Sequence, residues 1–154
     1  MLETPHVAVG VAIATKIPNP LLAIPLALMS HFILEKVPHW NPHLNSETEK
    51  YGKPTRQSTI ITAIDSTLAL VTGSYFAFRA LPDIGHAATI LAACFFSVLP
   101  DVVEAPYFFL NYRKKIIKRW ILWQKSIQVD WPVLPGLLTQ LAVVLAAIYF
   151  TLSR

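Results

Sequence analysis

Apolar residues dominate three long stretches of the chain. These stretches cover residues 58–81, 84–103 and 132–152. A helix needs about 20 mostly apolar residues to cross the hydrocarbon core of a bilayer. Each stretch is therefore predicted to form a membrane-spanning helix.

The amino-terminal region has a more interrupted pattern. Its two apolar runs, 5–15 and 21–37, are separated by a segment that contains Pro18 and Pro20. Each proline removes a backbone donor and clashes with the preceding helical turn, so one continuous helix is disfavoured. We expect a short first helix, a tight turn and a longer helix that returns beside it.

The composition is that of a membrane protein. Hydrophobic residues make up 54% of the chain and charged residues 14%, whereas a soluble domain is about 25% charged. The mean hydropathy of +0.48 also excludes a disordered chain, which needs low hydrophobicity and high charge. The long polar linker is 41–57, and no segment has a strand pattern. The predicted fold is all-α: a single integral-membrane domain, 1–154, forming a polytopic bundle of about five to six helices.

The net charge of +4 is unevenly distributed. Six of the thirteen Lys and Arg residues lie between Arg113 and Lys125, with no acidic residue among them. Beside apolar spans, such a segment is typical of a cytoplasmic loop that faces anionic lipids, and we expect no nucleic-acid site. The positive-inside rule then predicts that the amino terminus and the loops 41–57 and 112–131 are cytoplasmic, in a prokaryotic cytoplasmic membrane.

Several ionisable residues interrupt the apolar helices. His31 and Glu35 lie four residues apart, and Asp101 and Glu104 lie three apart, so each pair shares one helical face. Asp65 lies within the first long stretch. A charged side chain at the centre of a membrane helix costs about 2.5–3.5 kcal/mol on insertion scales, so these residues are expected to face the bundle interior.

The predicted topology places these residues at a common depth. At 1.5 Å per residue, His31 and Asp65 each lie roughly 10 Å from the cytoplasmic edge of their helices. Asp101 and Glu104 close a helix that descends toward that face, and His6 begins a helix that rises from it. Four separate helices therefore bring polar residues into one leaflet, which favours one shared site.

Imidazole and carboxylate groups gathered in an apolar bundle are typical of a divalent-metal site. The ion neutralises carboxylates that would otherwise repel one another. Zinc fits this donor set best, with manganese or iron as alternatives, and the number of candidates allows one or two ions. The predicted ligands are His6, His31, Glu35, His39, Asp65 and Asp101.

The same residues also have plainer interpretations. His31 and Glu35 could form a buried ion pair that orders the helices. Asp65 could cap a helix or pair with a neighbouring side chain, and Asp101, which follows Pro100, could be a helix-start residue.

Four segments of the chain carry a family resemblance. The segments are Thr4-Pro5-His6, Ser30-His31-Phe32-Ile33-Leu34-Glu35-Lys36-Val37-Pro38-His39-Trp40, Leu99-Pro100-Asp101 and Leu134-Pro135-Gly136-Leu137-Leu138. Together they resemble the small bacterial membrane-bound, LexA-regulated metal-dependent hydrolases, a group distantly similar to zinc-dependent phospholipase C. The resemblance implies an all-helical membrane fold with a metal centre of His and Asp. Related sequences usually carry Asp where this chain has Glu35, whose carboxylate is one methylene longer.

These observations favour a membrane-embedded, metal-dependent hydrolase acting at the cytoplasmic face. A metal-activated water would cleave a phosphoester or another lipid-linked anionic substrate, with Glu35 or Glu104 as the general base. The expected partners are membrane lipids, a lipid-like or phosphorylated substrate and a second copy of the chain in a homodimer.

A transport or ion-relay protein is the alternative hypothesis. In it, His31, Glu35 and Asp65 would bind a cation or pass protons without cleaving a bond. Transport needs polar residues that reach the other leaflet, and the outer half has few besides Gln140. A membrane scaffold with a purely structural polar cluster is a third hypothesis.

Overall fold

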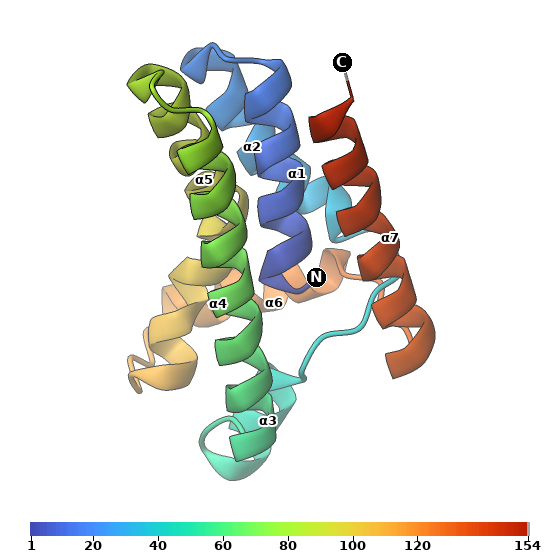
Figure 1. Ribbon diagram of the computed structural model, residues 1–154. Helices are drawn as coiled ribbons and strands as arrows, with labels where there is room; N and C mark the ends of the chain where they lie inside the picture. The colour runs from blue at the N-terminus through green and yellow to red at the C-terminus, as the bar shows by residue number, and fades with distance from the viewer. Residues whose placement is uncertain (154) are drawn as a thin grey trace.

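The computed structural model describes residues 1–153, which form seven α-helices and no β-strand (Figure 1). The predicted all-α class is confirmed, but the predicted count of five to six helices is wrong. The additional helices lie in the two segments that were predicted as polar loops. The seven helices are α1 (Glu3–Lys16), α2 (Pro20–Leu34), α3 (Leu44–Tyr51), α4 (Arg56–Arg79), α5 (Ile84–Phe109), α6 (Lys115–Ile127) and α7 (Val133–Leu152).

The additional helices, α3 and α6, follow local signals that their polar composition obscures. Helix α3 ends at Gly52, whose φ of 76° is the left-handed conformation that glycine adopts without strain. Helix α6 is amphipathic: Ile117, Trp120 and Ile121 are buried or half-buried at a helical spacing, whereas the basic residues Lys115 and Arg119 are exposed. A dense basic composition therefore does not prevent a helix when the apolar residues keep a helical spacing.

Two predicted helix boundaries also differ from the structure. Helix α2 ends at Leu34 rather than near residue 37, because the residue before Pro38 is sterically biased away from helical backbone. Helix α5 does not stop near residue 103 but continues to Phe109, through Pro100 and Pro106. Prolines are tolerated inside membrane helices where neighbouring groups satisfy the freed backbone.

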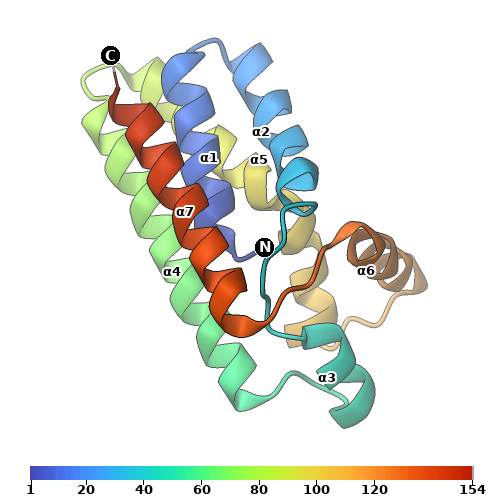
Figure 2. The ribbon, with the colours of Figure 1, turned by 90° about the vertical axis from the view of Figure 1, so that its right-hand side faces the viewer.

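Helix α1 is the central element of the bundle. It packs against α2, α4, α5 and α7, and Figure 2 shows it between α7 and α2. Small residues allow this close packing, as in other membrane bundles. A Cβ atom at Gly10 would lie 3.1 Å from both the Ala93 carbonyl oxygen and Ser97 Oγ on α5. The expected hairpin of a short first helix and a returning second helix is present as α1 and α2.

The outer surface of the bundle is apolar. Helices α4, α5 and α7 are long and apolar enough to cross a membrane, and large hydrophobic side chains such as Leu70, Phe78, Leu134 and Tyr149 are exposed on α4 and α7. The interior holds small and polar residues instead. An apolar exterior of this extent is consistent with association with a membrane, and the prediction of three helices that can span one is confirmed in length and composition.

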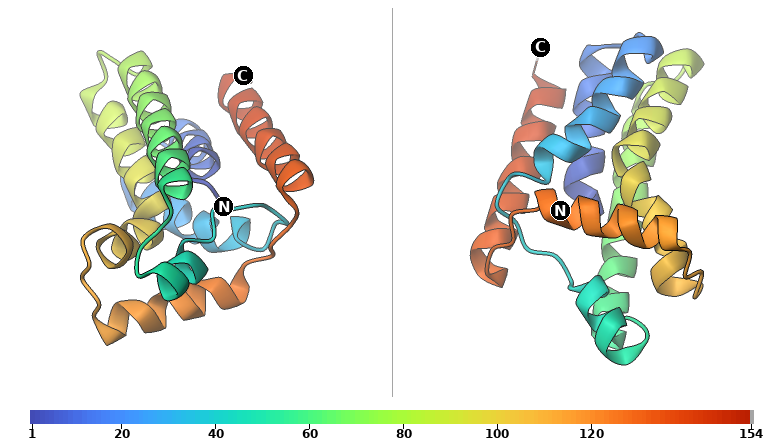
Figure 3. Two further views of the ribbon diagram at one scale, coloured as in Figure 1. Left: turned by 90° about the horizontal axis from the view of Figure 1, so that it is seen from below. Right: turned by 180° about the vertical axis from the view of Figure 1, so that it is seen from behind.

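Helix α6 lies across one end of the bundle (Figure 3). The ring centroids of Trp120 and Trp123 on α6 lie 5.0 Å apart, and both rings contact Phe32 of α2. Basic residues together with exposed aromatic rings are typical of a helix that lies in the membrane interface. Helices α3 and α6 lie toward the same end, as the alternation of the spans requires, and the side of the membrane that this end faces stays a prediction.

The junction between α3 and α4 is held by Glu47. Its carboxylate accepts hydrogen bonds from the Thr55 backbone nitrogen and from Ser58 Oγ, both at 2.7 Å. Partial burial raises the pKa of the Glu47 carboxyl, but the hydrogen bonds from Thr55 and Ser58 outweigh it and hold the pKa below its usual value. These hydrogen bonds therefore hold the N-terminus of α4 in place.

Candidate metal centre

Polar residues from α1, α2 and α5 meet inside the bundle. The imidazole rings of His6 and His31 stack with their centroids 4.2 Å apart and their planes 20° apart. His31 Nε2 lies 3.9 Å from Asp101 Oδ1. One ligand atom from each of these three residues lies within 4.8 Å of the others, which is close enough for the group to hold a metal ion. The sequence thus predicted correctly that these three distant residues converge.

The hydrogen bonds around the two histidines fix which nitrogen carries the proton. His31 Nδ1 donates to the Ser97 carbonyl oxygen at 2.9 Å, and His6 Nε2 donates to Glu35 Oε1 at 3.2 Å. The other nitrogens, His31 Nε2 and His6 Nδ1, are buried and have no hydrogen-bond partner within residues 1–153. Each ring therefore has one nitrogen with a free lone pair, which is the state in which histidine binds a metal.

This donor set fits a divalent cation. Two imidazole nitrogens and one carboxylate oxygen are typical of a catalytic zinc site, which uses three protein ligands and keeps a fourth position open. The bonds to the Ser97 carbonyl and the Glu35 carboxylate are the outer contacts that orient metal-binding histidines in such sites. Unpaired polar nitrogens are also costly to bury, and a bound cation would satisfy them.

Glu35 and His39 lie beside this group rather than in it. Glu35 Oε1 contacts the Met1 backbone nitrogen in addition to His6 Nε2, and Glu35 Oε2 lies 3.8 Å from His39 Nε2. His39 Nδ1 donates to the Val37 carbonyl at 2.7 Å, and its Nε2 accepts from Asn41 Nδ2 at 3.2 Å. Burial lowers the pKa of His39, which favours this neutral, fully hydrogen-bonded imidazole.

Asp65 occupies a different place from the His6, His31 and Asp101 group. Its carboxylate accepts hydrogen bonds from the backbone nitrogens of Glu3 at 2.5 Å and Thr4 at 3.2 Å, and from Thr4 Oγ1 at 2.7 Å. The first backbone N–H groups of a helix have no partner within the helix, and a carboxylate there is also favoured by the helix dipole. These contacts match the interpretation in which Asp65 caps a helix, namely α1.

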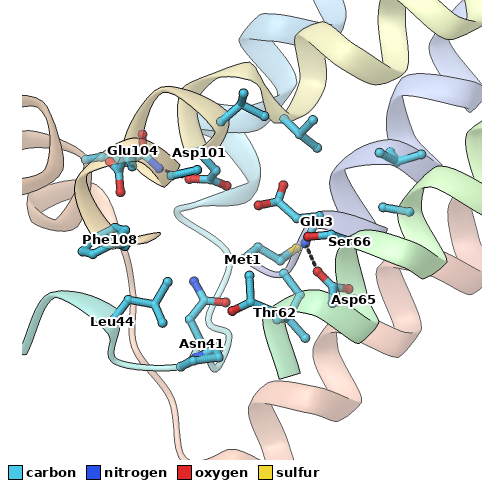
Figure 4. Close-up of a pocket in the computed structure, with 18 of the residues that line it drawn as sticks. Met1, Glu3, Asn41, Leu44, Thr62, Asp65, Ser66, Asp101, Glu104 and Phe108 are labelled. Atoms are coloured by element: carbon cyan, nitrogen blue, oxygen red, sulfur yellow. Dashed lines mark hydrogen bonds between the residues drawn. The ribbon is translucent and has the colours of Figure 1, made fainter. Parts of the chain in front are cut away.

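A cavity of about 620 Å³ adjoins the three-residue group. Figure 4 shows Asp101 and Glu104 on one wall, with Glu3 and Asp65 on the facing side. Glu104 Oε1 and Glu3 Oε2 are buried atoms for which the described chain supplies no hydrogen-bond partner. Asp101 lines the cavity and also belongs to the metal-binding group, so it connects the histidines to the open space.

Two residues of this site were not predicted from the sequence. Glu3 lies three residues before His6, and this spacing on one helical face could have identified it. The buried Gln124 side chain of α6 donates to Asp101 Oδ1. Gln124 gave no such signal, because only the docking of α6 on α5 brings the two residues together.

Comparisons with protein-family models, curated proteins and solved structures found no match to this chain. The resemblance to membrane-bound metal-dependent hydrolases therefore stays a prediction.

Proposed function

We propose that this protein is a membrane-embedded, metal-dependent hydrolase that cleaves phosphoester bonds of lipid substrates at the cytoplasmic face of a bacterial membrane. One observation carries the proposal: two buried histidines, each with one unpaired ring nitrogen, belong to a compact group with a carboxylate that lines a large cavity. A structural cluster would be expected to pair these nitrogens, because unsatisfied buried polar atoms are destabilising.

The proposed ligands are His6, His31 and Asp101. A divalent ion, zinc in the first instance, would supply a bound water of lowered pKa and neutralise carboxylate charge in the cavity. The Ser97 carbonyl and the Glu35 carboxylate hold the two imidazole rings in place. Gln124 donates to Asp101 Oδ1 and fixes that carboxylate in the same way.

Glu104 is the proposed general base. It lines the cavity three residues from Asp101, and its buried Oε1 is free to accept a proton. The water oxygen forms a bond to phosphorus while the ester oxygen leaves, and Glu104 takes the water proton and returns it to the leaving oxygen. Glu35, the other candidate, is already bonded to His6, so its role is to orient that ring.

The metal site is tested with full-length protein purified in detergent. We expect elemental analysis to find stoichiometric zinc, manganese or iron, and His31→Ala to remove it. His86→Ala is the matched control, because His86 Nε2 donates to the Ala14 carbonyl at the other end of α1. Absence of metal from the wild-type protein, or equal metal content in the two variants, would contradict the proposal.

The reaction is tested by release of phosphate or of diacylglycerol from phosphatidic acid in mixed micelles. Glu104→Gln keeps the size of the side chain but removes the base, so we expect turnover to fall by about 10²–10⁴-fold with metal content unchanged. Turnover equal to that of the wild type would show that Glu104 is not the base. A metal-loaded protein that hydrolyses none of a panel of lipid phosphoesters would contradict the hydrolase assignment itself.

A further inference from the structure

The cavity extends well beyond the metal-binding group. From Asp101 it continues along α5 to Leu91 and, on the facing helix, along α4 to Ser74. At 1.5 Å per residue, the ten residues from Asp101 to Leu91 correspond to roughly 15 Å along the helix axis. The cavity is therefore a groove between α4 and α5 that reaches toward the middle of the membrane.

The lining of this groove changes in polarity along its length. At the end near α6 it includes Asn45, Gln124, Lys125 and Gln128, whose side chains carry amide or ammonium donors, together with the carboxylate of Asp130. At the end toward the middle of the membrane it includes Leu70, Leu91 and Phe95. Asp101 and Glu104 lie between the two ends. This order matches an amphiphile whose anionic head lies near α6 and whose chain lies between α4 and α5.

The apolar end of the groove is open to the side. Leu70 is 72% exposed and Leu91 is 49% exposed, although both line the groove. Because α4 and α5 are long and apolar enough to cross a membrane, this side opening would face the acyl chains of the bilayer. A ligand chain could enter directly from the membrane without passing through water.

Gly73 lies in the inner wall of this groove. A Cβ atom at position 73 would lie 3.2 Å from Cys94 Sγ and 3.6 Å from Val7 Cγ1. The glycine thus lets α4 approach α5 and α1 closely, as small residues do in membrane bundles. The result is a continuous wall behind the groove, and the cavity volume of about 620 Å³ lies within the roughly 300–1,000 Å³ that is typical of small-molecule sites.

We propose that this groove binds one acyl chain of a membrane phospholipid and places its phosphate beside Asp101. The position of the phosphate rests on the proposed function, since a cation there would offset the negative charge of Asp101 and Glu104. Binding of the chain does not rest on it, because the apolar walls and the side opening are independent of metal. The site would therefore select lipids by chain as well as by head group.

The test uses dioleoylphosphatidic acid that carries a photoreactive diazirine in the middle of one chain, added to the full-length protein in nanodiscs. We expect peptide mapping to place adducts on Leu70, Leu91 and Phe95, and excess unlabelled dioleoylphosphatidic acid to suppress them. The double variant Leu70→Trp/Leu91→Trp fills the groove. Displacing about two methylenes from it should reduce adducts about tenfold.

The matched control is Val71→Trp/Ile84→Trp. Both residues are exposed on α4 and α5 but lie outside the groove, so adduct formation should equal that of the wild type. Equal adducts on the outward face of α4, no competition by unlabelled lipid, or equal loss in both double variants would overturn the inference. A cross-linked pair of chains through this face would assign the groove to a dimer contact instead.

The variant His31→Ala separates this inference from the proposed function. Groove adducts that persist in His31→Ala support chain binding, whether or not the wild-type protein hydrolyses lipid. Conversely, hydrolysis of short-chain and long-chain phosphoesters at equal efficiency, without groove adducts, would overturn the groove inference and leave the hydrolase proposal standing.

Discussion

The contact between α7 and the segment after α2 gives a sharp test of the packing. Gly136 lies in the first turn of α7, and a Cβ atom there would lie 2.5 Å from the Trp40 backbone nitrogen and 2.9 Å from the His39 carbonyl carbon. Such distances are below van der Waals contact, and backbone atoms cannot rotate away as a side chain can. Gly136→Ala must therefore push α7 away from residues 39 and 40.

Residues 39 and 40 are held by hydrogen bonds on several sides, and these bonds set the size of the destabilisation. The His39 backbone nitrogen donates to the Val129 carbonyl at 3.0 Å, and Trp131 donates to the His39 carbonyl at 2.8 Å. Gln140 Nε2 donates to the Trp40 carbonyl at 2.8 Å. Overpacking costs about 1–3 kcal/mol, and loss of one of these hydrogen bonds adds about 1 kcal/mol. We expect a total destabilisation of about 2–4 kcal/mol.

The assay is thermal unfolding of the purified protein in detergent. At about 2–4 °C per kcal/mol for a chain of this size, Gly136→Ala should lower the apparent Tm by roughly 5–15 °C. Gly85→Ala is the matched control, because its Cβ would meet only Asp83 Oδ1, at 3.5 Å. That variant should be neutral or slightly stabilising, since alanine is preferred to glycine within a helix. An equal Tm for the two variants would refute the argument.

Three further predictions concern the site and its supports. Asp65→Ala should lower the free energy of unfolding by about 1–3 kcal/mol, because the N-terminus of α1 loses its hydrogen-bond partners. The metal content should stay unchanged. Loss of metal at unchanged Tm would instead identify Asp65 as a ligand. Glu35→Gln removes the charged partner of His6 and should weaken metal affinity about 10–100-fold in a chelator competition, and unchanged affinity would show that this contact does not orient the ring. The depressed pKa of Glu47 stabilises the α3–α4 junction fully above the usual carboxyl pKa of 4.5, and this contribution is lost as the pH falls through the lowered folded-state pKa. The protection of the Ser58 amide against hydrogen exchange, taken relative to its intrinsic rate at each pH, should therefore fall over that acidic range in the wild type but not in Glu47→Gln. Parallel profiles would contradict the assignment.

Much of the fold can be read from the sequence because its causes are local. A run of about 20 apolar residues can satisfy its backbone inside a bilayer only as a helix, so α4, α5 and α7 follow from hydropathy. The break between α1 and α2 follows from Pro18 and Pro20, which cannot continue a helix. Helix α6 was predicted as a loop, because its dense basic charge is typical of a loop beside a membrane helix, although Ile117, Trp120 and Ile121 keep a helical spacing.

The site shows where local reasoning ends. The cost of burying ionisable groups predicted that His6, His31 and Asp101 would gather, and the structure brings them within 4.8 Å of one another. The same reasoning could not separate them from Asp65, because it uses depth and not direction. Asp65 faces the N-terminus of α1 and accepts hydrogen bonds from Glu3 and Thr4, and that contact exists only once α1 packs against α4.

Sequence alone thus determined which segments are long and apolar enough to cross a membrane and which side chains must turn inward, since both depend on the transfer energy of single residues. Tertiary structure decided which imidazole nitrogen keeps its lone pair, because the Ser97 carbonyl and the Glu35 carboxylate come from other helices. It also decided that a groove lies between α4 and α5. The shape of this groove depends on how closely α4 approaches α5, and Gly73 of α4 sets that distance where it contacts Cys94 of α5.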